Sequence, residues 1–461
     1  MLHDYELILQ NETVLSQSYH TAILHGFPVA LWRFPRTSQC HAMVDLSGGS
    51  QRAPARFSHL ATGFIMAPFH NRTETASYFI QAHLYLQGDT CYFGPASSEK
   101  KTRVRENRRR FEKTLYKLCA GNPPVVTPEP YWFRGTSYNP GGTIMTKAAY
   151  CRLVERALEE ITAEKLKKVV LSRALEVTLA QGFSPQNLFD HLCAAYPNAF
   201  VSLVALPGVG TWIGATPELL LSQQNDELTT VALAGTRPVS PGNVTGLPAS
   251  HVGLEPGSER FRSGNQAWEP GDNGTFSHSE WAQKWSEKEI DEQAIVSEFI
   301  RQAFAHHKID DYTEQRTESV RIGDLLHLQT KFKLESLASR GVNVVDTLLH
   351  SLHPTPAVCG VPQSKALTFI ERHESHAREF YAGYLGPVNL GEQSHLYVNL
   401  RCLQLLQNSA LLYAGGGITI DSIPVQEWLE TELKLDALLK VLNGDIRPVH
   451  AVRHGEVSCY E

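Results

Sequence analysis

Short stretches in which apolar and polar residues alternate recur along this chain, and this pattern is typical of half-buried β-strands. The strands predicted from it are 27–34, 78–85, 168–178, 201–206, 211–215, 331–334, 381–387 and 396–401. Within 168–178, Lys168 and Ser172 lie on one face, whereas Val169 and Leu171 lie on the other. The sequence therefore places the Lys168 side chain on a defined face of a strand.

A second pattern, with apolar residues three or four positions apart, predicts helices. Thr146 is suited to cap a helix that buries Tyr150 on its apolar face. Ser286 and Glu289 form a capping box, which begins a helix that runs to about His306. Helices and strands are thus mixed along the chain, which indicates an α/β fold.

Three glycines at 415–417, predicted to form a loop, precede a helix that carries Glu427, Glu430 and Lys434 on one stripe. The glycines let a ligand approach the backbone closely. Carboxylates on an otherwise apolar face need a cation or a proton. Ordinary ion pairs on a surface helix are the alternative interpretation. Because Glu292 also faces an apolar stripe on an upstream helix, we favour a metal site.

The composition of the chain excludes several classes of partner and location. The chain has 461 residues, 42% of them hydrophobic, and a formal net charge of −6, which argues against a nucleic-acid or lipid surface as the main partner. Glutamates interrupt the basic run at 100–110, which predicts a solvated helix face. The 8 cysteines are scattered without a C-x-x-C pair, and this predicts reduced thiols in the cytoplasm. No signal peptide is evident, and no apolar stretch approaches the about 20 residues that span a bilayer.

Three regions are predicted along the chain. Residues 1–135 form an N-terminal half rich in strands, 136–445 form the catalytic core, and 446–461 form a C-terminal tail. The stretch 239–283 is rich in Pro, Gly, Ser, Asn and His without a period, and we expect a flexible insertion there.

Several charged residues from separate elements suggest one chemistry. Lys168 and Glu218 are suited to act as an acid/base pair, and Glu292 and Glu430 are suited to bind a hard cation through oxygen. Arg401 and backbone amides could hold an anionic substrate. A solvated strand lysine and a plain turn glutamate remain alternatives on these residues alone.

Eight motifs, in the same order, resemble those of the chorismate-utilising enzymes. They are Lys168–Arg173, Gly214–Leu220, Leu233–Thr236, Ser286–Glu292, Leu352–Ala357, Tyr381–Gly383, Asn399–Arg401 and Ala414–Glu430. Each motif alone is a weak signal, but eight in register are specific. Within this family the chain is most similar to the isochorismate synthases, particularly those of the menaquinone pathway. The resemblance implies a single large α+β unit of two stacked, mainly antiparallel sheets flanked by helices.

The resemblance also implies catalytic roles. Lys168 would be the general base that activates water for attack at C2 of chorismate, and its neighbour Lys167 lies on the opposite strand face. Glu218 would be the general acid that protonates the departing C4 hydroxyl. A lysine base needs a lowered pKa and a carboxylic acid donor needs a raised pKa, so the two require different surroundings.

The same resemblance implies a Mg²⁺ site and a substrate pocket. Glu292 and Glu430 would bind Mg²⁺, with Glu289 and Glu427 in the site or beside it. The residues implied to bind chorismate are Gly235, Thr236, His327, Arg401, Gly415, Gly416 and Lys434.

Other activities occur on this scaffold. Aminodeoxychorismate synthases typically carry a pocket lysine where this chain has 232–235, Ala-Leu-Ala-Gly, and anthranilate synthases usually lack the lysine found here at 168. We therefore expect no glutamine amidotransferase partner. Salicylate synthase, which goes on to eliminate pyruvate, is the main alternative. A non-catalytic chorismate-binding protein would be expected to have lost one of the key acidic or basic residues.

Overall fold

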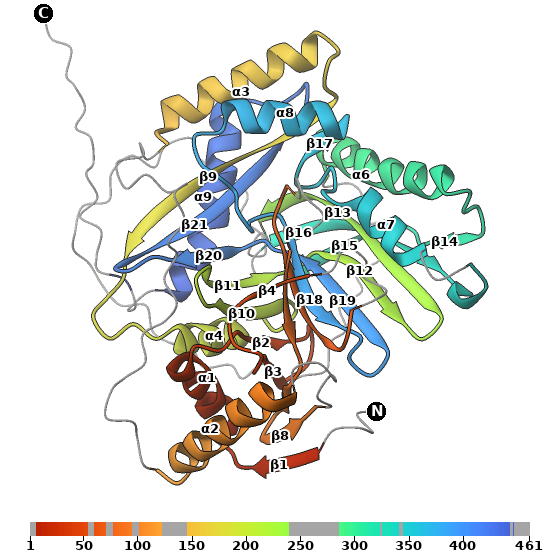
Figure 1. Cartoon of the computed structure of the whole chain (residues 1–461). Coiled ribbons are helices and arrows are strands. Elements are labelled where there is room, and N and C mark those ends of the chain that lie inside the picture. Colours follow the sequence, from red (N-terminus) through yellow and green to blue (C-terminus); the bar gives the residue numbers. More distant parts are fainter. Residues whose placement is uncertain are drawn as a thin grey trace, which may run out of the picture.

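The alternating stretches form two antiparallel sheets that pack against each other (Figure 1). The computed structural model describes residues 6–53, 60–70, 77–94, 101–121, 145–238, 285–322, 325–340, 344–442 and 446. The first sheet has 11 strands in the order β1 (Glu6–Gln10), β8 (Thr90–Phe93), β7 (Leu84–Gln87), β3 (Cys40–Val44), β2 (Val29–Arg33), β10 (Phe200–Leu206), β11 (Gly210–Thr216), β20 (Cys402–Leu405), β21 (Ser409–Ile418), β9 (Lys168–Thr178) and β17 (Gly360–Val361).

The second sheet is built mostly from later strands. Its order is β14 (Tyr312–Glu314), β16 (Leu325–Leu334), β13 (Glu227–Pro238), β12 (Leu219–Gln224), β19 (Gln393–Val398), β18 (Tyr384–Val388), β5 (Gly63–Ala67), β6 (Tyr78–Gln81) and β4 (Gln51–Arg52), with β15 (Glu318–Ile322) also paired to β16. Strands from the N-terminal region thus enter both sheets. The expected fold of two stacked antiparallel sheets is confirmed.

Helices flank the sheets at several sides (Figure 1). They are α1 (Val14–His25), α2 (Lys101–Cys119), α3 (Lys147–Thr162), α4 (Pro185–Ala195), α6 (Glu287–His306), the short 3₁₀ helix η2 (Leu337–Arg340), α7 (Val344–Leu352), α8 (Gln363–His373) and α9 (Pro424–Val441). The two predicted caps are confirmed. The Thr146 hydroxyl accepts the amide of Ala149, and Ser286 and Glu289 form the capping box of α6.

The first sheet is buried on both faces, so it serves two hydrophobic cores. Along β10, Phe200 and Val204 enter the core between the sheets. Val201 and Leu203 enter a second core, together with residues of α1, α2, α4 and the end of α9. This alternation follows from the period of two in a strand. Both cores therefore depend on the same sheet.

Three local predictions need correction. The predicted strand 78–85 is two strands, because β6 joins the second sheet and β7 the first. The glycines at 415–417 lie inside strand β21 instead of a loop. The strand predicted at 331–334 begins at Leu325, so His327 lies within it.

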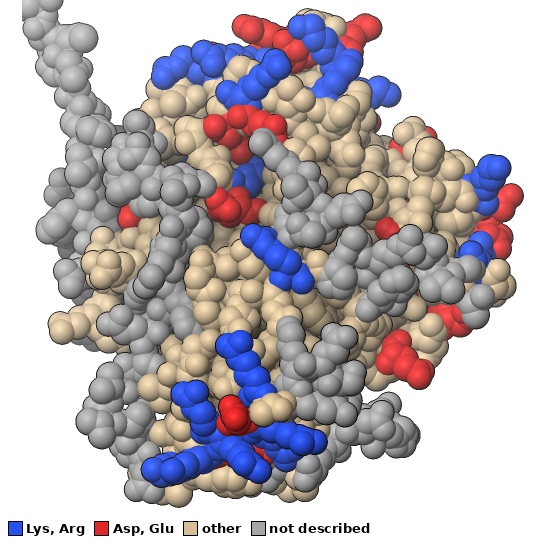
Figure 2. Space-filling view, viewed as in Figure 1, with Lys and Arg blue, Asp and Glu red and all other residues tan. Residues whose placement is uncertain are grey.

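The basic run at 100–110 falls mainly on α2. Val104 and Phe111 of this helix are buried, whereas Arg105 and Arg109 are exposed. Figure 2 shows Lys and Arg side chains gathered where α2 lies. The prediction of a solvated basic helix face is confirmed.

The predicted regions 1–135, 136–445 and 446–461 stay predictions. The boundary at 135 and the insertion expected at 239–283 lie outside the described residues, as does the tail apart from Ile446. Among the described helices, none combines the length and the apolar composition needed to cross a bilayer.

Because the two cores share one sheet, we expect them to unfold together. Leu188→Ala in the second core and Phe304→Ala in the first should each lower the free energy of unfolding by about 2–5 kcal/mol. Both variants should move a single transition, measured by calorimetry and by circular dichroism. Two transitions, each moved by only one variant, would contradict this expectation.

Candidate active site

The pairing of β9 with β21 brings the glycine strand against the strand that begins with Lys168. Its register sets Gly417 opposite Val170. A Cβ atom on Gly417 would lie 2.3 Å from Oε1 of Glu292 and 2.9 Å from Cε of Lys168. Only a glycine therefore leaves room for these two side chains to meet over the strand.

Lys168 and Glu292 form an ion pair inside the protein. The Lys168 side chain is 0% exposed, and its Nζ lies 2.8 Å from Oε1 of Glu292. The neighbouring Lys167 is exposed, as the strand alternation predicts. Burial alone would raise the pKa of Glu292, but the neighbouring ammonium groups, that of Lys168 first, hold it below its ordinary value.

Glu218 is a buried carboxyl between β11 and β12. It is 5% exposed. Burial raises the pKa of Glu218 to about 7, although the Lys168 ammonium and the Thr355 hydroxyl act in the opposite direction. Near neutral pH this carboxyl therefore still holds a proton in a large share of molecules, and it can donate that proton.

His327 presents a hydrogen-bond acceptor to the same pocket. Its Nδ1 lies 2.8 Å from the carbonyl oxygen of Gly235, to which it donates, so Nε2 carries a lone pair. Burial lowers the pKa of His327 to about 3, and the charges of Arg401 and Lys434 act in the same direction. His327 is therefore neutral at physiological pH. Among the described residues, Nε2 has no hydrogen-bond partner.

Arg401 stands between β19 and β20 in an unusual backbone conformation. Its φ of 48° lies in the left-handed region, which is uncommon outside glycine. Its carbonyl oxygen is held at 3.0 Å by the amide of Ala215 on β11. The Arg401 side chain lines the pocket, where a guanidinium is suited to bind a carboxylate.

Two glutamates of α9, Glu427 and Glu430, each pair with a lysine. Glu427 is fully buried and pairs with Lys288 of α6. Glu430 accepts from Lys434 at 2.7 Å, and Lys434 also donates to the carbonyl oxygen of Gly415 at 2.7 Å. Burial raises the pKa of Glu427; Lys288 opposes this shift and the charge of Glu430 adds to it.

One pocket collects most of these groups. Its lining consists of Val170, Pro217, Glu218, Leu233, Ala234, Gly235, Thr236, Glu292, His327, Ala357, Val358, Tyr381, Leu400, Arg401, Tyr413, Ala414, Gly415, Gly417, Glu430 and Lys434. Cationic, acidic and aromatic side chains thus face one space, which suits a small ring that carries negative charge.

Comparison with known proteins places this pocket in a family. The family model for chorismate binding enzymes matches residues 97–440. The chain belongs to the chorismate binding enzymes. Isochorismate synthase EntC of Escherichia coli K12 is 28% identical over 298 residues, covering 65% of this chain and 68% of EntC. Isochorismate synthase MenF of the same organism is 30% identical over 301 residues, covering 64% of this chain but only 60% of MenF.

Solved structures share the fold of this family member. The structure of MenF, the menaquinone-specific isochorismate synthase from Escherichia coli, aligns with a TM-score of 0.64 and 22% identity. The alignment covers 93% of this chain and 91% of that chain. The structure of a putative 2,3-dihydroxybenzoate-specific isochorismate synthase, DhbC from Bacillus anthracis, aligns with a TM-score of 0.63 and 20% identity over 93% of this chain and 99% of that chain.

Four residues predicted for this chorismate binding enzyme are not part of the pocket lining: Lys168, Gly416, Glu289 and Glu427. Lys168 pairs with Glu292, which does line the pocket. Gly416 faces the other side of β21, where a Cβ atom would lie 3.4 Å from Oε2 of Glu427. Glu289 caps α6 through Ser286, and its Cβ lies beside Gly235. The capping contact was predicted from spacing, but the contacts of Glu289 with Gly235 and of Gly416 with Glu427 were not, because they depend on how α6 and α9 approach the sheets.

Sequence reasoning assigned no role to three residues of the site. Lys288 belongs to the motif 286–292, and Tyr381 to the motif 381–383, so both had a signal. Tyr413 immediately precedes the glycine motif and had none. The Tyr381 and Tyr413 rings stack at 5.2 Å between centroids and form an aromatic wall of the pocket.

The donor set fits a divalent ion in its chemistry. Glu292 and Glu430 line the pocket, and Glu427 stands behind Gly416. The Glu427 Oε2 atom is buried beside Ser422 and makes no hydrogen bond of normal geometry within the described chain. Carboxylate oxygens are the ligands that Mg²⁺ prefers. In this arrangement lysines balance the carboxylates, and no three acidic, His or Cys side chains of the described residues are grouped closely enough to hold a metal.

The raised pKa of Glu218 predicts a pH-dependent stability. The stability that its proton contributes is fully present below the ordinary value of 4.5 and is lost as the pH rises through about 7. Glu218→Gln removes this loss, because the amide stays neutral. Relative to wild type, the variant should therefore gain about 2 kcal/mol of stability between pH 5 and pH 8.

Denaturant unfolding at the two pH values measures this gain. The matched control is Glu155→Gln, which changes an exposed carboxyl on α3. Its difference from wild type should stay the same at both pH values. An equal pH response of the two variants would show that Glu218 is ionised in the folded protein throughout this range.

Proposed function

We propose that this chain is an isochorismate synthase, an isomerase that converts chorismate to isochorismate by adding water at C2 and losing the C4 hydroxyl. The observation that carries the proposal is a buried Glu218 that keeps its proton, in a pocket also lined by Glu292, whose carboxylate pairs with the buried Lys168. The proposed acid and base, which need opposite pKa shifts, are thus close enough for the Lys168 charge to act on the pKa of Glu218. The relatives named isochorismate synthase, such as EntC and MenF, support this choice within the family.

In the proposed reaction, the oxygen of a water molecule forms a bond to C2 and its proton passes to the Lys168 amine. The ring double bond shifts, the C4–O bond breaks, and Glu218 gives its proton to the departing hydroxyl, which leaves as water. One water enters and one leaves, so the product is an isomer. Lys168 accepts a proton only as a free amine, so Glu292 must turn to another cationic partner during turnover.

Substrate binding is assigned to charges and polar atoms around the pocket. Arg401 is placed to hold a carboxylate of chorismate. Neutral His327 offers Nε2 to a substrate hydroxyl, because its Nδ1 is already engaged by Gly235. Thr236 and Gly415 complete the polar wall, and Lys434 adds positive charge above it. These groups have in common that they suit a dianion with a hydroxyl group.

Mg²⁺ is the proposed cofactor. Glu292 and Glu430 would hold it, with Glu427 and Glu289 beside them, and the ion would supply positive charge to the ring carboxylate. The support is electrostatic. With Glu218 protonated, three lysines and Arg401 face the ionised carboxylates of Glu292, Glu427 and Glu430. These groups sum to one positive charge, and to none once Lys168 is the free amine that its role requires. A dianionic substrate would then leave two negative charges, which a divalent ion would neutralise.

We propose further that the isochorismate is made for menaquinone synthesis, and the 30% identity to MenF supports this role. We also propose that the enzyme works in the cytoplasm without a glutamine amidotransferase. The described cysteines are free thiols, in line with a reducing compartment.

Incubation of the purified protein with chorismate and Mg²⁺ should yield isochorismate, identified by chromatography and mass spectrometry. Salicylate and pyruvate as the main products would instead identify a salicylate synthase. Lys168→Ala should lower turnover by about 10²–10⁴-fold, since it removes the base. Lys167→Ala, on the exposed face of the same strand segment, should leave turnover unchanged. Equal turnover of the two variants would show that Lys168 is not the base.

Glu430→Gln should raise the Mg²⁺ concentration needed for half-maximal activity by at least about tenfold, because it removes a charged ligand. The control is Glu432→Gln on the same helix. Glu432 is 52% exposed and pairs with Arg173, away from the pocket. Titration of Mg²⁺ at fixed chorismate measures both variants. Similar shifts in the two would place the metal elsewhere.

A further inference from the structure

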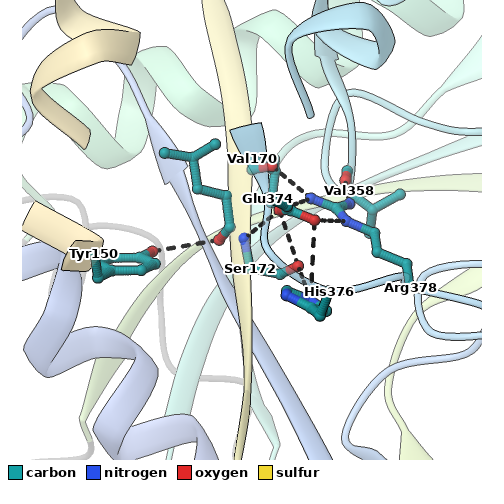
Figure 3. Close-up of polar contacts among 8 residues, drawn as sticks. Tyr150, Val170, Ser172, Val358, Glu374, His376 and Arg378 are labelled. Carbon is teal, nitrogen blue, oxygen red and sulfur yellow. Dashed lines mark hydrogen bonds and ion pairs between the residues drawn. The ribbon is translucent and has the colours of Figure 1, made fainter. Parts of the chain in front are cut away.

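A buried ion pair stands behind the strand that carries Lys168. Nε of Arg378 donates to Oε2 of Glu374 at 2.8 Å, and Nη2 donates to Oε1 at 2.6 Å (Figure 3). The two side chains are 3% and 2% exposed. Burial alone would raise the pKa of Glu374, but the Arg378 guanidinium holds it below its ordinary value, so the carboxylate keeps its charge.

This ion pair makes hydrogen bonds to backbone groups along the outer edge of β9. Strand β17 pairs with β9 at Lys168 and Val169, and the amide of Val170 still donates to the carbonyl oxygen of Cys359 at 2.7 Å. Beyond this point no strand of the described residues lies along that edge. From there on, side chains take the place of the ladder. Nη2 of Arg378 donates to the carbonyl oxygen of Val170 at 2.7 Å, and Oε1 of Glu374 accepts from the amide of Ser172 at 2.6 Å. Buried backbone groups need such partners, so the pair fixes the path of this strand.

The same guanidinium also bonds a second segment of the pocket lining. Nη1 of Arg378 donates to the carbonyl oxygen of Val358 at 2.7 Å. Val170 and Val358 both line the pocket, although they lie on different segments. Arg378 thus links these two segments through their backbone carbonyl oxygens, and one of them, Val170, is two residues from Lys168 (Figure 3).

Ser172 completes the cluster. Its hydroxyl donates to Oε1 of Glu374 at 3.0 Å and lies 3.1 Å from Nε2 of His376. Burial is the main cause that lowers the pKa of His376, so the ring is neutral and Nε2 can serve as a partner of the hydroxyl. Each polar side chain of the cluster therefore has a partner, which makes a stiff support.

We propose that Glu374 and Arg378 are positioning residues, which act through the backbone of β9 to fix the Lys168 amine relative to the pocket wall. This role rests on the proposed isomerase function. Neither residue lines the pocket, so neither touches substrate. A lysine base must meet a water molecule within hydrogen-bond distance, and small displacements of a catalytic group are costly.

Glu374→Gln tests the role, because it keeps the shape of the side chain but removes the charge that orders Arg378. Amide hydrogen exchange of the peptide that contains 168–173 should become at least about tenfold faster, since the Ser172 amide loses a charged acceptor. kcat should fall on the order of 10- to 100-fold, whereas KM for chorismate should stay within about twofold. The proposed substrate-binding groups, such as Arg401 and His327, lie on other segments.

A control variant distinguishes a positioning role from a general effect on stability. Leu188→Ala destabilises the second core, so it lowers the thermal midpoint and should speed exchange by a similar factor throughout the sheets, without a selective effect on 168–173, while kcat stays unchanged. Both variants are measured well below their midpoints. If Glu374→Gln matches Leu188→Ala in kcat and in strand exchange, the positioning role is wrong.

Ser172→Ala provides a second variant if Glu374→Gln does not fold. It removes only the hydroxyl contacts to Glu374 and His376, and it should produce the same two effects at smaller size. Unchanged exchange and unchanged kcat in this variant would count against the role. Amide hydrogen exchange is measured without substrate, so it tests the positioning role independently of the reaction. A wild-type protein that makes no isochorismate would overturn only the proposed function. Unchanged exchange in the variants overturns the positioning role alone.

Discussion

Close approach of backbone and charge at one strand pair is the constraint on which the site depends. Strand β21 pairs with β9 and places Gly417 next to Lys168 and Glu292, where any side chain on residue 417 would collide with them. A buried ammonium can face a buried carboxylate there at 2.8 Å. Removing one partner of such a pair would leave an uncompensated charge inside the protein, which is strongly destabilising. The glycine is therefore required by sterics first and by electrostatics second.

The charges around this strand pair act on one another. Three lysines face the carboxylates of two helices, and the buried carboxyl of Glu218 holds its proton up to about pH 7 because water is excluded. The arrangement keeps Glu218 as a proton donor while the nearby Glu292, whose pKa is held below its ordinary value, stays ionised. Membership of the chorismate binding enzymes explains what such a pocket is for: it accepts a small dianionic ring.

Local sequence patterns determined much of the fold. The β9 strand, the α3 cap at Thr146 and the capping box of α6 were predictable because each depends on residues close together in the chain. The predictions failed where a strand changes partner. Residues 78–85 look like one strand because alternation continues through them, yet Ala82 and His83 separate strands of different sheets. Alternation specifies burial of a face and cannot specify which sheet buries it.

The candidate site divides in the same way. Sequence motifs identified Lys168, Glu218, Glu292 and Arg401, because the chemistry needs those residue types and the family resemblance fixed their order. Only the tertiary structure decided that Gly417 meets Glu292, that Lys288 neutralises Glu427, and that Glu374 and Arg378 hold the edge of β9. These contacts join segments far apart in the chain, and their geometry is set by how sheets and helices pack. The sequence determined which groups are present, whereas packing determined which of them meet.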